Sequence, residues 1–265
     1  MSRGLPRWAT SVLGTLAVLA GWWLLSAIVP STGSYAPVPS PAAVVATLLD
    51  DGAGLYWTNF VVTITEAGIG YAVGNAVALL MAALVLLLPR ADWFVNQLAV
   101  ITYCIPIVAI GPIAVVVLGG ARSPGDPSAT AVLFAGLSVV FTTVVGALLG
   151  LRAADRAALD VVSVYGGSRL TQLRKVRLVA AIPAVFTALQ IAVPAAFLGA
   201  VLGEYFGKIS RGVGPLLVSS QVALDSPRVW AVLLISALVA IVGFGLMGLL
   251  GRLAAPWSAG QGARA

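Results

Sequence analysis

The sequence predicts an all-α integral membrane protein that crosses the bilayer six times. Hydrophobic residues make up 60% of its 265 positions and charged residues only 9%, whereas about 25% of residues are charged in a soluble domain. Between its 15 basic and 9 acidic side chains lie six long uncharged runs, at 8–49, 67–89, 93–121, 127–151, 178–203 and 229–251. Each run can hold the roughly 20 apolar residues that span a bilayer. We therefore expect membrane helices joined by loops, with no large soluble domain.

The residue types that are missing exclude several classes of enzyme. The chain has no histidine, so neither a Ser-His-Asp triad nor a His-Glu-x-x-His zinc site is possible. The sequence contains no G-x-x-x-x-G-K-[ST] loop, which excludes a P-loop for ATP. The one cysteine, Cys104, lies in an apolar run, where we expect a small buried hydrophobe. We predict no catalytic residue, no metal site and no cofactor of the chain's own.

Residues 1–58 are expected to form an N-terminal membrane helix and an external loop. The helix runs over about 8–29. The loop at 30–58 contains four prolines, a short helical turn at 42–49 and the acidic pair Asp50 and Asp51. This composition is typical of loops.

Residues 59–250 are expected to form the transmembrane domain. The uncharged runs place its helices at about 59–88, 93–117, 128–149, 182–203 and 229–250. The span at 93–117 contains Pro106 and Pro112, which remove backbone donors and bend a helix. Residues 251–265 are left as a short tail.

The distribution of Lys and Arg orients the chain. With the N-terminus inside, the cytoplasmic loops carry 11 of the 15 basic residues, as the positive-inside rule requires. Both termini are then cytoplasmic, and so is the polar loop at 152–181. Because topology explains the formal net charge of +6, we expect no nucleic-acid partner.

The polar segment at 153–183 predicts two short amphipathic helices. Good helix formers lead to Gly166 and Gly167, which end the first helix, and Ser168 can cap a second one. Apolar residues follow at mostly helical spacing. Such a helix pair has to bury its apolar face, either in the inner membrane surface or on a partner protein.

This segment resembles the cytoplasmic loop of ABC importer permeases, the membrane subunits of binding-protein-dependent transport systems. The loop of that family carries Glu-Ala-Ala, three residues, Gly, nine residues, Ile, one residue and Leu-Pro. At that spacing this chain has Asp160, Val161, Val162, Gly166, Val176, Leu178 and Val179, with Pro183 four residues further on. The stretches 39–41, 165–169 and 199–204 are similar to the nitrate, sulfonate and taurine branch of these permeases. The likeness covers about residues 37–250.

The resemblance implies a type I ABC importer permease fold and a set of partners. In that family the loop helix docks on a cytoplasmic dimer of ABC ATPase subunits, which use ATP and Mg²⁺, and transmits their closure to the membrane helices. The matching ATPase-coupling positions here are Asp160, Val161, Val164, Tyr165, Gly166, Gly167, Ser168 and Arg169. The other implied partners are a second permease copy, identical or not, an extracytoplasmic substrate-binding protein and membrane lipid. Such a protein is a multi-pass component of a prokaryotic cytoplasmic membrane.

Prolines within the spans are candidates for the transport pathway. Pro106, Pro112 and Pro194 free backbone carbonyls and bend helices, which in transporters occurs where backbone lines a cavity. Tyr103 either faces such a cavity or packs as an ordinary aromatic.

Two glutamates are expected toward the outer face. Glu204 ends the fifth span, and Glu66 lies seven residues, or about 10 Å, into the second. At this depth we expect both to reach water or to pair with Lys208 or Arg211. Glu204 is then either part of an external gate or binding-protein surface, or an interface anchor. Glu66 stands where the family usually carries an arginine, so the sign of the substrate's charge stays open.

Two other function classes compete with an importer permease. An ATP-independent secondary transporter or channel would be expected to carry ionisable residues deep in its spans. An integral-membrane enzyme would need a cluster of nucleophile, base or metal ligands. The permease interpretation is preferred, with the secondary transporter as its alternative. The branch resemblance implies sulfonate, taurine or nitrate as cargo, although permeases with the same signature also carry vitamin precursors and aromatic acids.

Overall fold

The computed structural model describes residues 7–31, 36–121, 123–207 and 209–257, and every regular element within these ranges is helical. The elements are α1 (Arg7–Ile28), α2 (Pro41–Leu87), η1 (Pro89–Ala91), α3 (Asp92–Cys104), α4 (Ile107–Leu118), α5 (Ala129–Arg152), α6 (Arg156–Val164), α7 (Arg169–Gln172), η2 (Leu173–Arg177), α8 (Leu178–Phe206), α9 (Val213–Val222) and α10 (Ser226–Ala254). Five of these helices are long and apolar enough to cross a membrane, and the bent pair of α3 and α4 makes a sixth candidate. The predicted class, an all-α membrane protein, is confirmed.

The second membrane helix, α2, starts earlier than the sequence predicts. Ser40 caps it by accepting a hydrogen bond from the Ala43 backbone N–H at 3.2 Å, and Pro41 fills the first helical turn, a place that suits proline. Most of the expected external loop up to residue 58 is therefore helical. Gly52 bends the helix, because its φ of 69° and ψ of 159° are not helical and suit only glycine.

The predicted span at 93–117 is two helices rather than one. α3 and α4 meet at 91° because Pro106 and the residue before it, Ile105, have extended backbones, as is usual around proline. Pro112 lies inside α4. The bend also leaves Cys104 exposed at the end of α3, so the expectation that it is buried is wrong.

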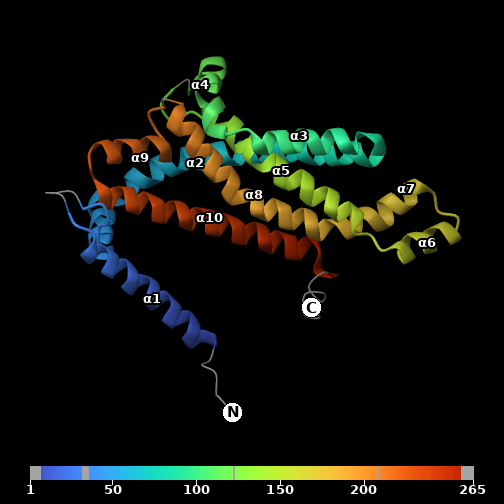
Figure 1. Ribbon diagram of the computed structural model, residues 1–265, viewed down its shortest axis with the longest axis horizontal. Helices are drawn as coiled ribbons and strands as arrows, with labels where there is room; N and C mark the ends of the chain where they lie inside the picture. The colour runs from blue at the N-terminus through green and yellow to red at the C-terminus, as the bar shows by residue number, and fades with distance from the viewer. Residues whose placement is uncertain (1–6, 32–35, 122, 208, 258–265) are drawn as a thin grey trace, which may run out of the picture.

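Helix α5 lies between α2 and α8 and makes the closest contacts of the bundle (Figure 1). A Cβ on Gly203 of α8 would collide with the Cα of Ala131 in α5, and a Cβ on Gly74 of α2 would lie 2.8 Å from an α5 Cα atom. Small residues thus let these backbones approach closely, which is how helices pack in lipid. A buried hydrogen bond from Thr143 to the Asn75 side chain also joins α5 to α2.

The outer helices attach to this three-helix core. α10 packs along α8, and α1 extends away from the bundle and meets it near its C-terminal end (Figure 1). There Trp22 stacks on Trp230 of α10 with 5.2 Å between ring centroids, and its Nε1 donates to the Pro39 carbonyl at 3.0 Å. α6 and α7 lie at one end of α8 and α9 lies at the other (Figure 1), so the length of that helix separates them.

Candidate functional site

The predicted coupling positions form a capped helix–turn–helix. Asp155 caps α6 by accepting from the Ala157 backbone N–H at 3.1 Å. Ser168 caps α7 by accepting from the Thr171 backbone N–H at 3.3 Å, as its type and place predict. Gln172 holds the two helices together, because its Nε2 donates to Ser163 Oγ at 2.7 Å.

The turn between α6 and α7 depends on both of its glycines. Gly166 has a φ of +73°, in the left-handed region that favours glycine. Its N–H donates to the Ser163 carbonyl at 2.9 Å, and the Gly167 N–H donates to the Val162 carbonyl at 2.8 Å. A Cβ on Gly167 would collide with the Val162 side chain. These bonds close the end of α6 in the manner of a Schellman motif.

The tip of this segment presents apolar side chains with nothing packed on them. Val161 is 55% exposed, Val164 84% and Tyr165 87%, and none of the residues of α6 is buried. Asp160 and Arg169 are exposed beside them. The segment projects from one end of the bundle (Figure 1). An exposed apolar patch on a polar element marks a surface for a partner or for a membrane.

The tip is continuous with a membrane helix. From Arg169 to Phe206 the chain runs through α7, η2 and α8 as one apolar helix. η2 is a short π-helical stretch, a local irregularity that is frequent at functional sites. A force on α7 therefore reaches α8, and with it Pro194 and Glu204, without crossing a flexible loop.

At the opposite end of α8, side chains from two other helices satisfy the N-terminus of α9. The Gly212 N–H donates to Asn59 Oδ1 at 3.0 Å, the Val213 N–H to Thr63 Oγ1 at 2.9 Å, and the Gly214 N–H to Glu204 Oε2 at 2.7 Å. The first backbone donors of a helix have no partner within the helix. Side chains of α2 and α8 accept these hydrogen bonds and so cap α9. α9 is thereby fixed against both helices.

Neither of the two glutamates reaches water in the structure. Glu204 is 1% exposed and Glu66 is fully buried, because α9 folds back over the end of α8 and the start of α5 covers α2. Glu66 accepts from the Ser128 backbone N–H at 2.6 Å. Arg211 is exposed, and Lys208 lies outside the described residues. The expectation that Glu66 and Glu204 reach water is wrong.

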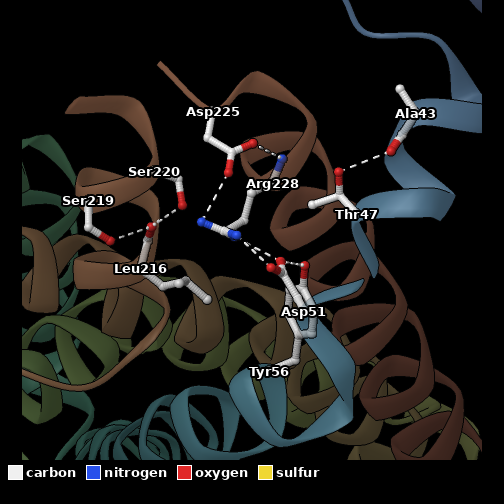
Figure 2. A network of polar contacts seen from close by, with 9 residues as sticks. All are labelled: Ala43, Thr47, Asp51, Tyr56, Leu216, Ser219, Ser220, Asp225 and Arg228. Carbon is white, nitrogen blue, oxygen red and sulfur yellow. Dashed lines mark hydrogen bonds and ion pairs between the residues drawn. The ribbon is translucent and has the colours of Figure 1, made fainter. Parts of the chain in front are cut away.

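A second polar cluster, which the sequence did not reveal, joins the bend of α2 to the start of α10 (Figure 2). Arg228 donates to both oxygens of Asp51, with 2.8 Å from Nε to Oδ2, and also pairs with Asp225 at 3.0 Å. Tyr56 donates to the same Asp51 carboxylate at 2.7 Å. Asp51 and Arg228 are 177 residues apart in sequence, so no local pattern could have paired them.

The five pathway candidates do not converge on one place. Tyr103 is 70% exposed and stacks on Phe141 of α5 at 4.5 Å between ring centroids, while Pro106 and Pro112 shape the bend into α4. Pro194 lies half-buried within α8, and Glu204 belongs to the α9 junction. The structure thus gathers the predicted coupling positions at one tip and distributes the predicted pathway positions over three helices.

The family model and the similar proteins agree on one family of transport permeases. The family model described as "Binding-protein-dependent transport system inner membrane component" matches residues 74–255. A probable ABC transporter permease protein of Haemophilus influenzae is 32% identical over 224 residues, which are 84% of this chain and 86% of that protein. The formylaminopyrimidine transport permease protein ThiX of Halalkalibacterium halodurans is 28% identical over 83% of this chain and 85% of its own length. A putative aliphatic sulfonates transport permease protein, SsuC of Bacillus subtilis, is 22% identical over 94% of this chain and 88% of its own length.

Proposed function

Because the chain belongs to the family of inner membrane components of binding-protein-dependent transport systems, we propose that it is the importer subunit whose α6–α7 tip is moved by a cytoplasmic ATPase. As a member of that family it is a multi-pass permease of a prokaryotic plasma membrane. The observation that carries the proposal is the exposed apolar tip formed by Val161, Val164 and Tyr165.

The proposed coupling follows from how the tip is built. Its apolar side chains enter a groove on the ATPase, and Asp160 and Arg169 give polar contacts at the rim. Two caps and the glycine turn keep α6 and α7 at a fixed angle, so motion of the groove moves both helices together. The uninterrupted helix from Arg169 to Phe206 then carries that motion across the membrane. In this proposal ATP and Mg²⁺ bind to the ATPase subunits rather than to this chain.

The remaining partners complete the proposed complex. A second permease copy, identical or related, lines the pathway together with this one. An extracytoplasmic binding protein delivers the solute at the α9 end, where the α2, α8 and α9 junction lies. This arrangement puts the tip and both termini in the cytoplasm.

The cargo is proposed to be a small organic solute. The similar permeases carry names for a formylaminopyrimidine and for aliphatic sulfonates, which share no functional group that one membrane site would recognise. This diversity fits a division of labour in which the binding protein selects the solute.

The test is co-purification of the tagged chain from its native membrane in mild detergent. We expect a cytoplasmic ATPase to stay bound to the wild type and to be lost in the double variant Val164→Ser and Tyr165→Ser, because these substitutions remove the apolar contacts of the tip. Val116→Ser is a matched control, since Val116 is 86% exposed in α4, away from the tip. It should retain the ATPase.

Reconstitution distinguishes an ATP-driven importer from an ATP-independent secondary transporter. In liposomes, uptake should require the ATPase, ATP and the binding protein. If the chain alone transports solute without ATP, it is a secondary transporter, and the tip is then only a membrane-surface helix pair.

A further inference from the structure

Two acidic side chains lie against each other inside the bundle. Glu66 of α2 and Glu204 of α8 are both buried, and residues one turn from each of them contact the other's surroundings. Hydrogen bonds and close contacts of neighbouring residues bring the two side chains together. Thr63, one turn before Glu66, donates to Glu204 Oε1 at 2.6 Å. The Ser128 backbone N–H binds Glu66. The Oγ of Ser128 lies 3.4 Å from the position that a Cβ on Gly207 would take. Gly207 is about one turn after Glu204 in sequence.

Glu204 has the environment of an ionised carboxylate. Its Oε1 accepts from Thr63 Oγ1 at 2.6 Å and its Oε2 accepts from the Gly214 N–H at 2.7 Å. That N–H belongs to the first turn of α9, and the N-terminus of a helix carries a partial positive charge that stabilises an anion. Both oxygens of Glu204 thus act as acceptors.

Glu66 has a different environment. Its Oε1 accepts from the Ser128 N–H at 2.6 Å, but its buried Oε2 receives no hydrogen bond, and the Oγ of Ser128 is likewise buried without a partner. A bare oxygen of an ionised carboxylate is costly to bury. The same oxygen has a partner if it carries a proton, because a carboxylic acid donates a hydrogen bond and the ionised Glu204 beside it can accept one.

The charges in this region point to the same conclusion. In the described ranges the ion pairs involve Asp51, Asp92 and Asp225 and leave both buried glutamates without a cation. Two adjacent buried carboxylates that are both ionised repel each other and lose their hydration. One proton removes half of that charge and turns the repulsion into a charge-assisted hydrogen bond.

We propose that Glu66 and Glu204 hold one proton between them, carried on Glu66 Oε2 and donated to Glu204, as a proton-binding site that fastens α2 and α5 to α8 and α9. The proton comes from water when this end of the bundle closes, and the pair keeps one negative charge, which faces the N-terminus of α9. Moving α2 away from α8 at this end breaks the acid–carboxylate bond. The proposal rests on the geometry of the pair and is independent of the importer function.

Infrared spectroscopy tests for the proton directly. The probe is the purified full chain at pH 7, with and without ¹³C-labelled glutamate. We expect a carbonyl-stretching band of a protonated carboxylic acid that shifts on labelling, is lost in Glu66→Gln and persists in Glu204→Gln.

Stability separates a donated proton from simple packing. The amide of Glu66→Gln can donate the same hydrogen bond to Glu204, so we expect its unfolding temperature to stay within about 4 °C of the wild type. Glu66→Ala has no donor and should unfold at a clearly lower temperature. If Glu66→Gln loses as much stability as Glu66→Ala, Glu66 is not the donor.

Three spectroscopic outcomes would overturn the proposal. Absence of the band in the wild type under all conditions means that both groups are ionised. A band that appears only after sodium and other metal ions are removed assigns the pair to a cation. A band that appears only in Lys208→Met means that this lysine neutralises the pair.

Discussion

At the scale of single residues, the two glycines of the α6–α7 turn serve different physical needs. Gly166 has open space around it but a φ of +73°, whereas Gly167 has no room for a Cβ beside Val162. A side chain at the first position strains the backbone, and a side chain at the second collides. Their place in the sequence predicts that both glycines end the first helix. The structure shows that backbone conformation requires glycine at 166 and that lack of space requires it at 167.

The first prediction concerns Gly166→Val. A β-branched residue at positive φ costs about 1–2 kcal/mol, which should open the turn and change the angle of the tip. We expect ATP-dependent uptake to be lost, while the amount of protein inserted in the membrane is unchanged. Vesicle uptake assays and membrane fractionation measure the two quantities.

A matched control for this change is Gly245→Val. Gly245 lies in α10 with helical φ and open space, so the substitution adds the same side chain without strain. It should transport normally. Normal uptake in Gly166→Val itself would remove the turn from the coupling mechanism.

At the scale of elements, the contact between α2 and α10 depends on one arginine. The Asp51 side chain is 9% exposed and that of Arg228 is 31% exposed. If Asp51 is removed, Arg228 keeps Asp225 as a partner. If Arg228 is removed, the Tyr56 hydroxyl is the side-chain donor that Asp51 keeps among the described residues. The two truncations are therefore not equivalent.

A double-mutant cycle tests this asymmetry. We expect Arg228→Met to destabilise the protein by about 2–4 kcal/mol, because it leaves a nearly buried carboxylate without its cation, and Asp51→Asn to cost about 1–2 kcal/mol. The double variant should cost less than the sum of the two, with a coupling energy of about 1–3 kcal/mol. Thermal unfolding in detergent gives the three values.

Equal losses of unfolding free energy in the two single variants, with additive losses in the double variant, would show that the Asp51–Arg228 contact does not contribute to stability as predicted. Leu198→Ala is a suitable reference, because Leu198 is 60% exposed on α8 and makes no polar contact there. Its unfolding temperature should stay near that of the wild type.

At the scale of the whole molecule, α8 separates the α6–α7 tip from α9. α8 has 29 residues, or about 44 Å at 1.5 Å per residue, which exceeds the roughly 30 Å of a bilayer core. We therefore expect the tip before it and α9 after it to lie on opposite sides of the membrane. The distribution of Lys and Arg predicts that the tip is on the cytoplasmic side.

Cysteine labelling tests this arrangement. In a Cys104→Ser background, Val164→Cys and Val222→Cys introduce thiols at positions that are 84% and 80% exposed. We expect a membrane-impermeant maleimide to reach Val222→Cys in intact cells, and to reach Val164→Cys only after the membrane is opened. Labelling of both from the same side would contradict the topology.

The class of the protein follows from its sequence, because hydropathy and the spacing of charges are local properties of the chain. Runs of about 20 apolar residues are stable in the bilayer, and the motif around Gly166 is contiguous, so the helices and the predicted coupling segment could be inferred from neighbouring residues. Helix ends such as Pro41 depend on capping geometry, and the broken span shows that a proline can end a helix where the pattern suggests only a bend.

Tertiary structure alone decided the burial and pairing of charges. Glu66 and Glu204 are 138 positions apart in sequence, and their depth along a helix predicted water on both. Their actual neighbours come from α5 and α9, which pack over them. Asp51 and Arg228 likewise meet because α2 and α10 pack against each other. Long-range contacts of this kind follow from how helices pack, and no periodicity within one segment carries that information.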